Sequence, residues 1–160
     1  MRRILFAAAL AVTACQSAPP PAAFTPEQIS VLRDNGFEQV GDAWELAFSN
    51  KLLFPFDQSA LADGQAENIG TMTGALLGVG VHGAKVVGHT DSDGPAEYND
   101  ELSLQRALAV KSAMIAAGMK SGSIEAEGAG ERYPVETNDT ALGRQENRRV
   151  VVIVTSIDAS

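Results

Sequence analysis

Three clusters of polar residues stand at the ends of apolar runs in this sequence, where strands or helices are expected to begin or end. They are Gly88–Gly94, Tyr98–Ala107 and Gly143–Val150. The first follows a short apolar run and the second opens a long amphipathic segment, so the two flank one loop–helix turn. Asp91 in the first cluster and Arg106 in the second can therefore face the same pocket.

A carboxylate and a guanidinium held at a fixed separation suit a zwitterionic ligand that carries both an ammonium and a carboxylate. The planar guanidinium of Arg106 can bind a carboxylate through two parallel hydrogen bonds, which a lysine cannot do. Asp91 would then bind the ammonium. Both residues are expected at a loop or at the start of a helix, outside the apolar core.

The N-terminus resembles the export and lipidation segment of bacterial lipoproteins. Arg2 and Arg3 precede the apolar run 4–12, which is too short to span a membrane but is typical of a secretory signal. Small residues then lead into Cys15, the only cysteine of the chain. We expect the Cys15 thiol to carry lipid. Gln16 is not the aspartate that retains many such proteins in the inner membrane, so we expect an outer-membrane anchor with the domain facing the periplasm.

The composition limits the classes of function. The 160 residues are 45% hydrophobic and 20% charged, as in ordinary globular proteins. The 20 acidic residues exceed the 12 basic ones and give a net charge of −8, which argues against a general nucleic-acid binder. A single cysteine excludes an intramolecular disulfide framework and a cysteine-rich zinc site.

The chain divides into four predicted segments. These are a signal peptide (1–14), the lipidated cysteine with a Pro/Ala tether (15–24), an N-terminal helix and linker (25–43) and a compact domain (44–157). The helix has Thr25 as its cap, Pro26 at its first position, Gln28 to close a capping box and Gly36 to end it.

The domain alternates between strand and helix patterns. Strands are predicted over 44–48, 52–56, 85–88, 124–127 and 150–155, and helices over 59–79, 96–118 and 139–147. This order predicts an α/β (α+β) two-layer sandwich, with helices on one face of a mixed sheet. Trp44, Met72 and Met114 are expected in its core.

Three motifs follow one another in residues 44–156: Gly-His-Thr-Asp at 88–91, Tyr-Asn-x-x-Leu-Ser-x-x-Arg-Ala at 98–107 and Asn-Arg-Arg-Val at 147–150. Together they resemble the OmpA-like peptidoglycan-binding domain. It implies a βαβαββ-type fold and binding of meso-diaminopimelate in the stem peptide of peptidoglycan. Asp91 would bind the ammonium of this ligand and Arg106 its carboxylate. The resemblance places further pocket residues at Ser59, Asn99, Leu102 and Arg148.

The segments 24–28, 36–37 and 44–54 resemble a lipoprotein branch of the same family. This likeness implies a second partner, a periplasmic repressor protein. Its capture would release an inner-membrane diguanylate cyclase.

Other interpretations remain for individual residues. Asp91 taken alone could cap a turn, Arg106 could be a solvated helix charge, and His89 is interpreted as a structural hydrogen-bonding residue. The segment 89–100 partly matches a calcium loop, but its first and last ligands are wrong. Ser92, His89 and Asp91 are too close in sequence for the triad of a peptidoglycan hydrolase. The sequence therefore favours non-catalytic binding without a cofactor.

Overall fold

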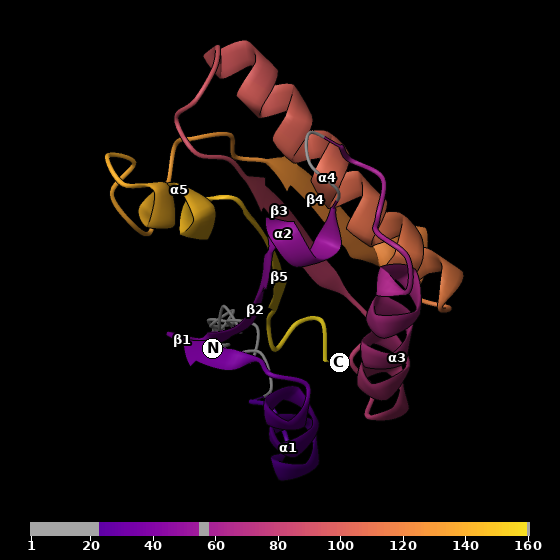
Figure 1. Ribbon diagram of the computed structural model, residues 1–160. Helices are drawn as coiled ribbons and strands as arrows, with labels where there is room; N and C mark the ends of the chain where they lie inside the picture. Colours follow the sequence, from indigo (N-terminus) through magenta and orange to yellow (C-terminus); the bar gives the residue numbers. More distant parts are fainter. Residues whose placement is uncertain (1–22, 55–57, 160) are drawn as a thin grey trace, which may run out of the picture.

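The computed structural model describes residues 23–54 and 58–159. A five-stranded sheet has the order β1-β2-β5-β3-β4, and α3 and α4 cover one of its faces (Figure 1). The strands are β1 (Glu38–Val40), β2 (Ala43–Ser49), β3 (Ala84–His89), β4 (Ile124–Gly128) and β5 (Arg149–Val154). The helices are α1 (Pro26–Asp34), α2 (Asn50–Leu53), α3 (Gln65–Gly78), α4 (Ala96–Ala116) and α5 (Ala141–Asn147), with a 3-10 turn at Ser121–Ser123.

The sheet is mixed. β3 and β4 are parallel, whereas β5 pairs antiparallel with both β2 and β3. The predicted two-layer sandwich, with helices on one face of a mixed sheet, is confirmed; to the expected βαβαββ order the structure adds the short α5 between β4 and β5. The predicted domain boundaries remain predictions.

The core lies between the sheet and its covering helices. Alternate residues of β5 point into it, because Val150, Val152 and Val154 are completely buried. The core also contains Trp44, Leu53, Ile69, Met72, Leu76, Val86, Val110 and Met114. The expected core positions of Trp44, Met72 and Met114 are confirmed.

The N-terminal helix has the predicted cap. The Thr25 hydroxyl accepts a hydrogen bond from the Gln28 backbone at 3.2 Å, and the Gln28 side chain accepts one from the Thr25 N–H at 2.9 Å. Gln28 also donates to the backbone carbonyls of Val79 at 3.0 Å and Ala159 at 3.4 Å. α1 is thereby attached to the turn before β3 and to the C-terminus.

One predicted strand is wrong. The described part of 52–56 contains the end of the helical turn α2, and residues 55–57 lie outside the described part. β2 ends at Ser49. The Asn50 N–H still donates to the Arg148 carbonyl at 2.9 Å, and the chain then turns into α2 and buries Leu53 and Phe54. α3 begins later than expected because Gly64 adopts a positive φ of 78° just before it. β1 was not predicted, since all three of its residues are exposed and show no alternation.

Candidate functional site

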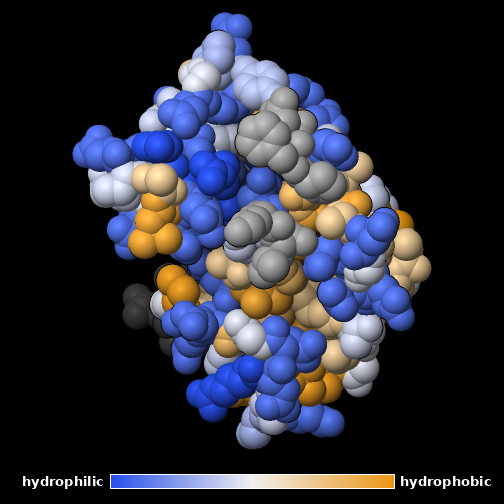
Figure 2. All heavy atoms as spheres, viewed as in Figure 1, coloured by the Kyte–Doolittle hydropathy of each residue, from blue (hydrophilic) through white to orange (hydrophobic). Residues whose placement is uncertain are grey.

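The candidate site lies at the carboxyl end of β3, where a loop leads into α4. Strand and helix touch at Gly88, where a Cβ atom would lie 2.0 Å from the Ser103 carbonyl oxygen. The Ser103 hydroxyl donates to the Asp100 carbonyl at 2.8 Å and accepts from the Gly130 N–H at 3.0 Å. The contact at Gly88 thus brings the end of β3 against α4, and the Ser103–Gly130 hydrogen bond attaches the loop after β4 to the same helix. The surface between α5 and the beginning of α4 is predominantly hydrophilic (Figure 2).

Asp91 is buried, with 6% of its surface exposed. Its Oδ1 accepts a hydrogen bond from the Asp93 N–H at 3.2 Å. Its Oδ2 forms an ion pair with Nη1 of Arg148, at the end of α5. The carboxylate that the sequence assigns to a ligand ammonium is therefore paired with a guanidinium in this structure.

Arg106 lies further along α4 and is 3% exposed. Its Nε donates to the Gln58 carbonyl at 3.2 Å, and its guanidinium carbon lies 5.5 Å from the centroid of the Phe54 ring. The expectation that Arg106 lies outside the apolar core is wrong. Seven residues separate it from Asn99, so the two lie on one face of α4, about 10 Å apart along the axis.

Asn99 connects the loop after β3 to the loop after β4. Its amide nitrogen lies 3.3 Å from the Asp91 carbonyl oxygen, 3.2 Å from the Asp93 carbonyl oxygen and 3.0 Å from Oε2 of Glu131. Because Asn99 is only 2% exposed, these contacts use its side chain within the protein. Its observed role is to position the Asp91 loop.

The predicted site residues fall into two groups. Asp91, Asn99 and Arg148 are joined through the contacts of the loop after β3. Arg106 instead contacts the segment that contains Ser59, through the carbonyl of Gln58. Leu102 and Ser59 are half-buried. Cys15, the predicted lipidation site, lies outside the described residues.

Sequence reasoning missed the contribution of α5 to this loop. Nε of Arg144 lies 3.4 Å from Oδ2 of Asp93, so α5 supplies one arginine to each of the acids at 91 and 93. Arg144 and Arg148 are four residues apart, which places them on one helix face. The sequence of the third polar cluster shows this spacing of the two arginines, but it does not show that Asp91 and Asp93 are the acids that they contact.

Asn147 is completely buried and organises the loop before α5. Its Oδ1 accepts from the backbone N–H groups of Val135 at 2.8 Å and Glu136 at 3.0 Å. Its Nδ2 lies 2.8 Å from the Glu136 carbonyl oxygen and 2.9 Å from Oδ1 of Asn138. The asparagine of the third motif therefore has a structural role.

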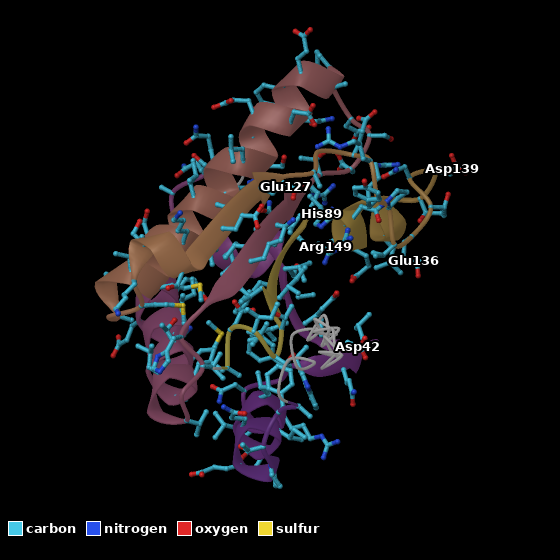
Figure 3. The ribbon with its side chains drawn as sticks, turned by 180° about the vertical axis from the view of Figure 1, so that it is seen from behind. Asp42, His89, Glu127, Glu136, Asp139 and Arg149 are labelled. Atoms are coloured by element: carbon cyan, nitrogen blue, oxygen red, sulfur yellow. The ribbon has the colours of Figure 1, made fainter. Side chains whose placement is uncertain are left out.

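His89 belongs to the opposite face of the sheet. It lies beside Arg149 on the neighbouring strand, away from α3 and α4 (Figure 3). Burial, assisted by the charge of Arg149, lowers the pKa of His89 from near 6.5 to about 4. Among the described residues, its buried Nδ1 has no hydrogen-bond partner, so this nitrogen gives no support to the interpretation of His89 as a structural hydrogen-bonding residue. With Asp91 paired to Arg148, His89, Asp91 and Ser92 do not form a catalytic triad.

The same face carries a shallow groove of about 540 Å³. Val87, Val151 and Ile153 form part of its floor, and Glu45, His89 and Arg149 are among its polar lining residues. Neither Asp91 nor Arg106 lines it. The candidate site and the groove are therefore separate.

Within residues 23–54 and 58–159, no group of three or more His, Cys, Asp and Glu side chains is arranged to hold a metal ion. Asp93 and Asp100, two acids of the calcium interpretation, pair instead with Arg144 and Arg132. No helix in this part of the chain is long and apolar enough to cross a membrane.

The fold and the position of this site define a class of protein. Residues 53–148 match the OmpA family model, and the chain belongs to that family. It is 39% identical over 150 residues to the outer-membrane lipoprotein YfiB of Pseudomonas aeruginosa, with 94% of this chain and 89% of the relative covered. It is 38% identical over 148 residues to the putative lipoprotein YfiB of Escherichia coli, with 92% and 91% covered.

Solved structures agree with this assignment. The cell wall anchor of the type VI secretion system from Pseudomonas aeruginosa matches with a TM-score of 0.69 and 28% identity, over 84% of this chain and 97% of that one. The peptidoglycan-associated lipoprotein from Burkholderia pseudomallei matches with a TM-score of 0.57 and 26% identity, over 64% and 86%. The predicted family is confirmed, and the relatives are outer-membrane lipoproteins and wall-associated proteins rather than enzymes.

Proposed function

We propose that this protein is an outer-membrane lipoprotein that binds peptidoglycan without catalysis and so tethers the membrane to the cell wall. Cys15 would carry the acyl chains that hold it in the outer membrane, with the domain facing the periplasm. The names of the relatives support the membrane location and the association with the wall. The recognised group would be meso-diaminopimelate in the stem peptide.

The observation that carries this proposal is a buried carboxylate and a buried guanidinium at the positions where the family motifs place them. Asp91 is 6% exposed and Arg106 is 3% exposed. Asp91 pairs with Arg148 and Arg106 donates to the Gln58 carbonyl, so the protein holds both charged groups in fixed positions. Asp91 would bind the ligand ammonium and Arg106 would bind the carboxylate next to it.

The proposal predicts discrimination between wall peptides. Diaminopimelate carries a carboxylate beside its distal ammonium, whereas lysine has the ammonium alone. A pocket built around Arg106 should therefore bind diaminopimelate peptides about ten- to a hundredfold more tightly than lysine peptides, because one charge-assisted interaction is lost. Calorimetry with both peptides measures this ratio, and equal affinities would contradict the pocket.

The residues are tested with conservative variants, because both side chains are buried. Asp91→Asn and Arg106→Lys should each lower affinity for peptidoglycan about ten- to a hundredfold. Asp63→Asn and Arg33→Lys make the same chemical changes at exposed positions and should bind normally. Sedimentation with insoluble peptidoglycan gives the binding, and circular dichroism on the same samples gives the folding. If the folded Asp91 and Arg106 variants sediment with peptidoglycan like the wild type, these two residues do not form the binding site.

The similarity to YfiB over 94% of this chain supports a second proposal. It is the capture of the periplasmic repressor YfiR, which would release a diguanylate cyclase. Calorimetry with the purified repressor tests it, and no heat of binding by the lipid-free chain would refute it. A cell-wall digestion assay tests the alternative of a peptidoglycan hydrolase, because a protein that only binds would release no wall fragments.

A further inference from the structure

Two arginines of α5 hold the loop after β3. Nη1 of Arg148 pairs with Oδ2 of Asp91, and Nε of Arg144 lies 3.4 Å from Oδ2 of Asp93. Together with the Asp93 N–H on Oδ1, the first of these contacts leaves both oxygens of Asp91 engaged. A ligand ammonium that approaches Asp91 therefore meets a carboxylate whose charge is already balanced.

The geometry points to Arg148 as the residue that sets the affinity of the site by competing with the ligand for Asp91. This inference rests on the proposed binding of a diaminopimelate peptide. We propose that the ligand ammonium displaces the Arg148 guanidinium from Oδ2. A ligand then binds only if its other contacts offset the loss of the Arg148–Asp91 pair.

The burial of the two partners shows which one can leave. The Arg148 side chain is 38% exposed, whereas the Asp91 side chain is 8% exposed. A released guanidinium can turn into water at little cost, but the carboxylate cannot. The Asp91 backbone is also held by Asn99, and the Arg144–Asp93 pair can keep α5 on the loop while Arg148 moves.

The competition acts on every ligand that presents an ammonium to Asp91. Each such ligand must release Arg148, so the loss of the Arg148–Asp91 pair lowers the affinity of each by the same factor. Arg148 thereby weakens binding in general, and the discrimination between diaminopimelate and lysine peptides is left to Arg106.

The test compares Arg148→Gln with Arg144→Gln. Both remove one positive charge from the same face of α5, but only the first frees Asp91. Calorimetry with a diaminopimelate stem peptide and with its lysine analogue gives both affinities. We expect Arg148→Gln to bind both peptides about two- to tenfold more tightly, with the ratio of the two affinities unchanged, because both ammonium groups face the same competitor. Arg144→Gln should give no such gain for either peptide.

Arg148→Lys protects the test against a failure of folding, because it keeps a cation beside Asp91 but loses the planar guanidinium. Its affinity for both peptides should lie between those of the wild type and Arg148→Gln, and melting curves identify folded samples. Equal or weaker binding by both folded Arg148 variants, or a gain confined to one of the two peptides, would overturn the competition. If neither peptide binds the folded wild type or any folded variant, the proposed function itself fails.

Discussion

Gly88 should tolerate no side chain, and its replacement tests how the site is built. In Gly88→Ala the new Cβ would lie 2.0 Å from the Ser103 carbonyl oxygen and 2.8 Å from its carbonyl carbon. A normal carbon–oxygen contact is about 3.3 Å, so β3 and α4 would have to separate by more than about 1 Å. Neither backbone can rotate away as a flexible side chain would.

We expect Gly88→Ala to lower the free energy of unfolding by about 3 kcal/mol, the upper end of the range for overpacked side chains. This loss corresponds to a decrease of about 10 °C in the melting temperature. Binding should suffer as well. Asp91 lies three residues beyond Gly88, and Arg106 lies three residues beyond Ser103, so any separation displaces the two charges relative to each other. Urea denaturation and peptidoglycan sedimentation measure the two effects on one sample.

Gly74→Ala is the matched control. Gly74 lies within α3, and a Cβ there would meet no atom within 4 Å. Alanine at this position should stabilise the protein by about 0.5–1 kcal/mol, since it has the higher helix propensity. A Gly88→Ala protein that is as stable as the wild type and still binds would refute the close contact between β3 and α4.

Three other outcomes are expected. Asn147→Ala should cost about 2–3 kcal/mol in urea denaturation, because it removes the partners of the backbone N–H groups of Val135 and Glu136; a loss below 0.5 kcal/mol would contradict this role. The pKa of His89 is lowered to about 4, so as the pH falls the unfolded chain binds the proton before the folded protein does. The free energy of unfolding should therefore fall by about 3 kcal/mol between about pH 6.5 and pH 4. His89→Phe should reduce this pH dependence, and an unchanged dependence in the variant would contradict the buried imidazole. Cys15→Ser should abolish labelling by a clickable fatty acid, and equal label on the variant would exclude the anchor.

The sequence predicted those parts of the fold that depend on local patterns. The cap of α1, the long periodic α4 and the β-branched run of β5 all appear within a few residues of their predicted ends. α2 was missed because an apolar, aromatic segment can be buried as a helical turn as readily as in a strand. β1 was missed because its three exposed residues carry no pattern.

The same division applies to the site. The motifs identified Asp91 and Arg106, but the pairing of Asp91 with Arg148 joins residues 57 positions apart and depends on how α5 reaches the loop after β3. The burial of Arg106 likewise comes from contacts with Gln58 and Phe54, outside its own helix. A sequence motif can identify a charged residue of the site, but the partner of that residue depends on the tertiary packing.

The position of α1 has a mechanical consequence. α1 and the loop after β3 lie at opposite ends of the sheet (Figure 1). Phe24 packs edge-on against Trp44 at the beginning of β2, and the Asn50 N–H bonds to the Arg148 carbonyl just beyond its end. A pull between residue 23 and Asp91 would therefore run along β2 and β5, whose register extends from Trp44–Val154 to Ser49–Arg149.

Antiparallel hydrogen bonds lie perpendicular to the strands, so this pull loads the whole ladder in shear instead of opening its bonds one at a time. Under the proposed function, with the N-terminus anchored in a membrane and Asp91 bound to the wall, separation of the two would load the sheet in this direction. The weaker direction is the peeling of β1 from β2, where only three residues of β1 are paired.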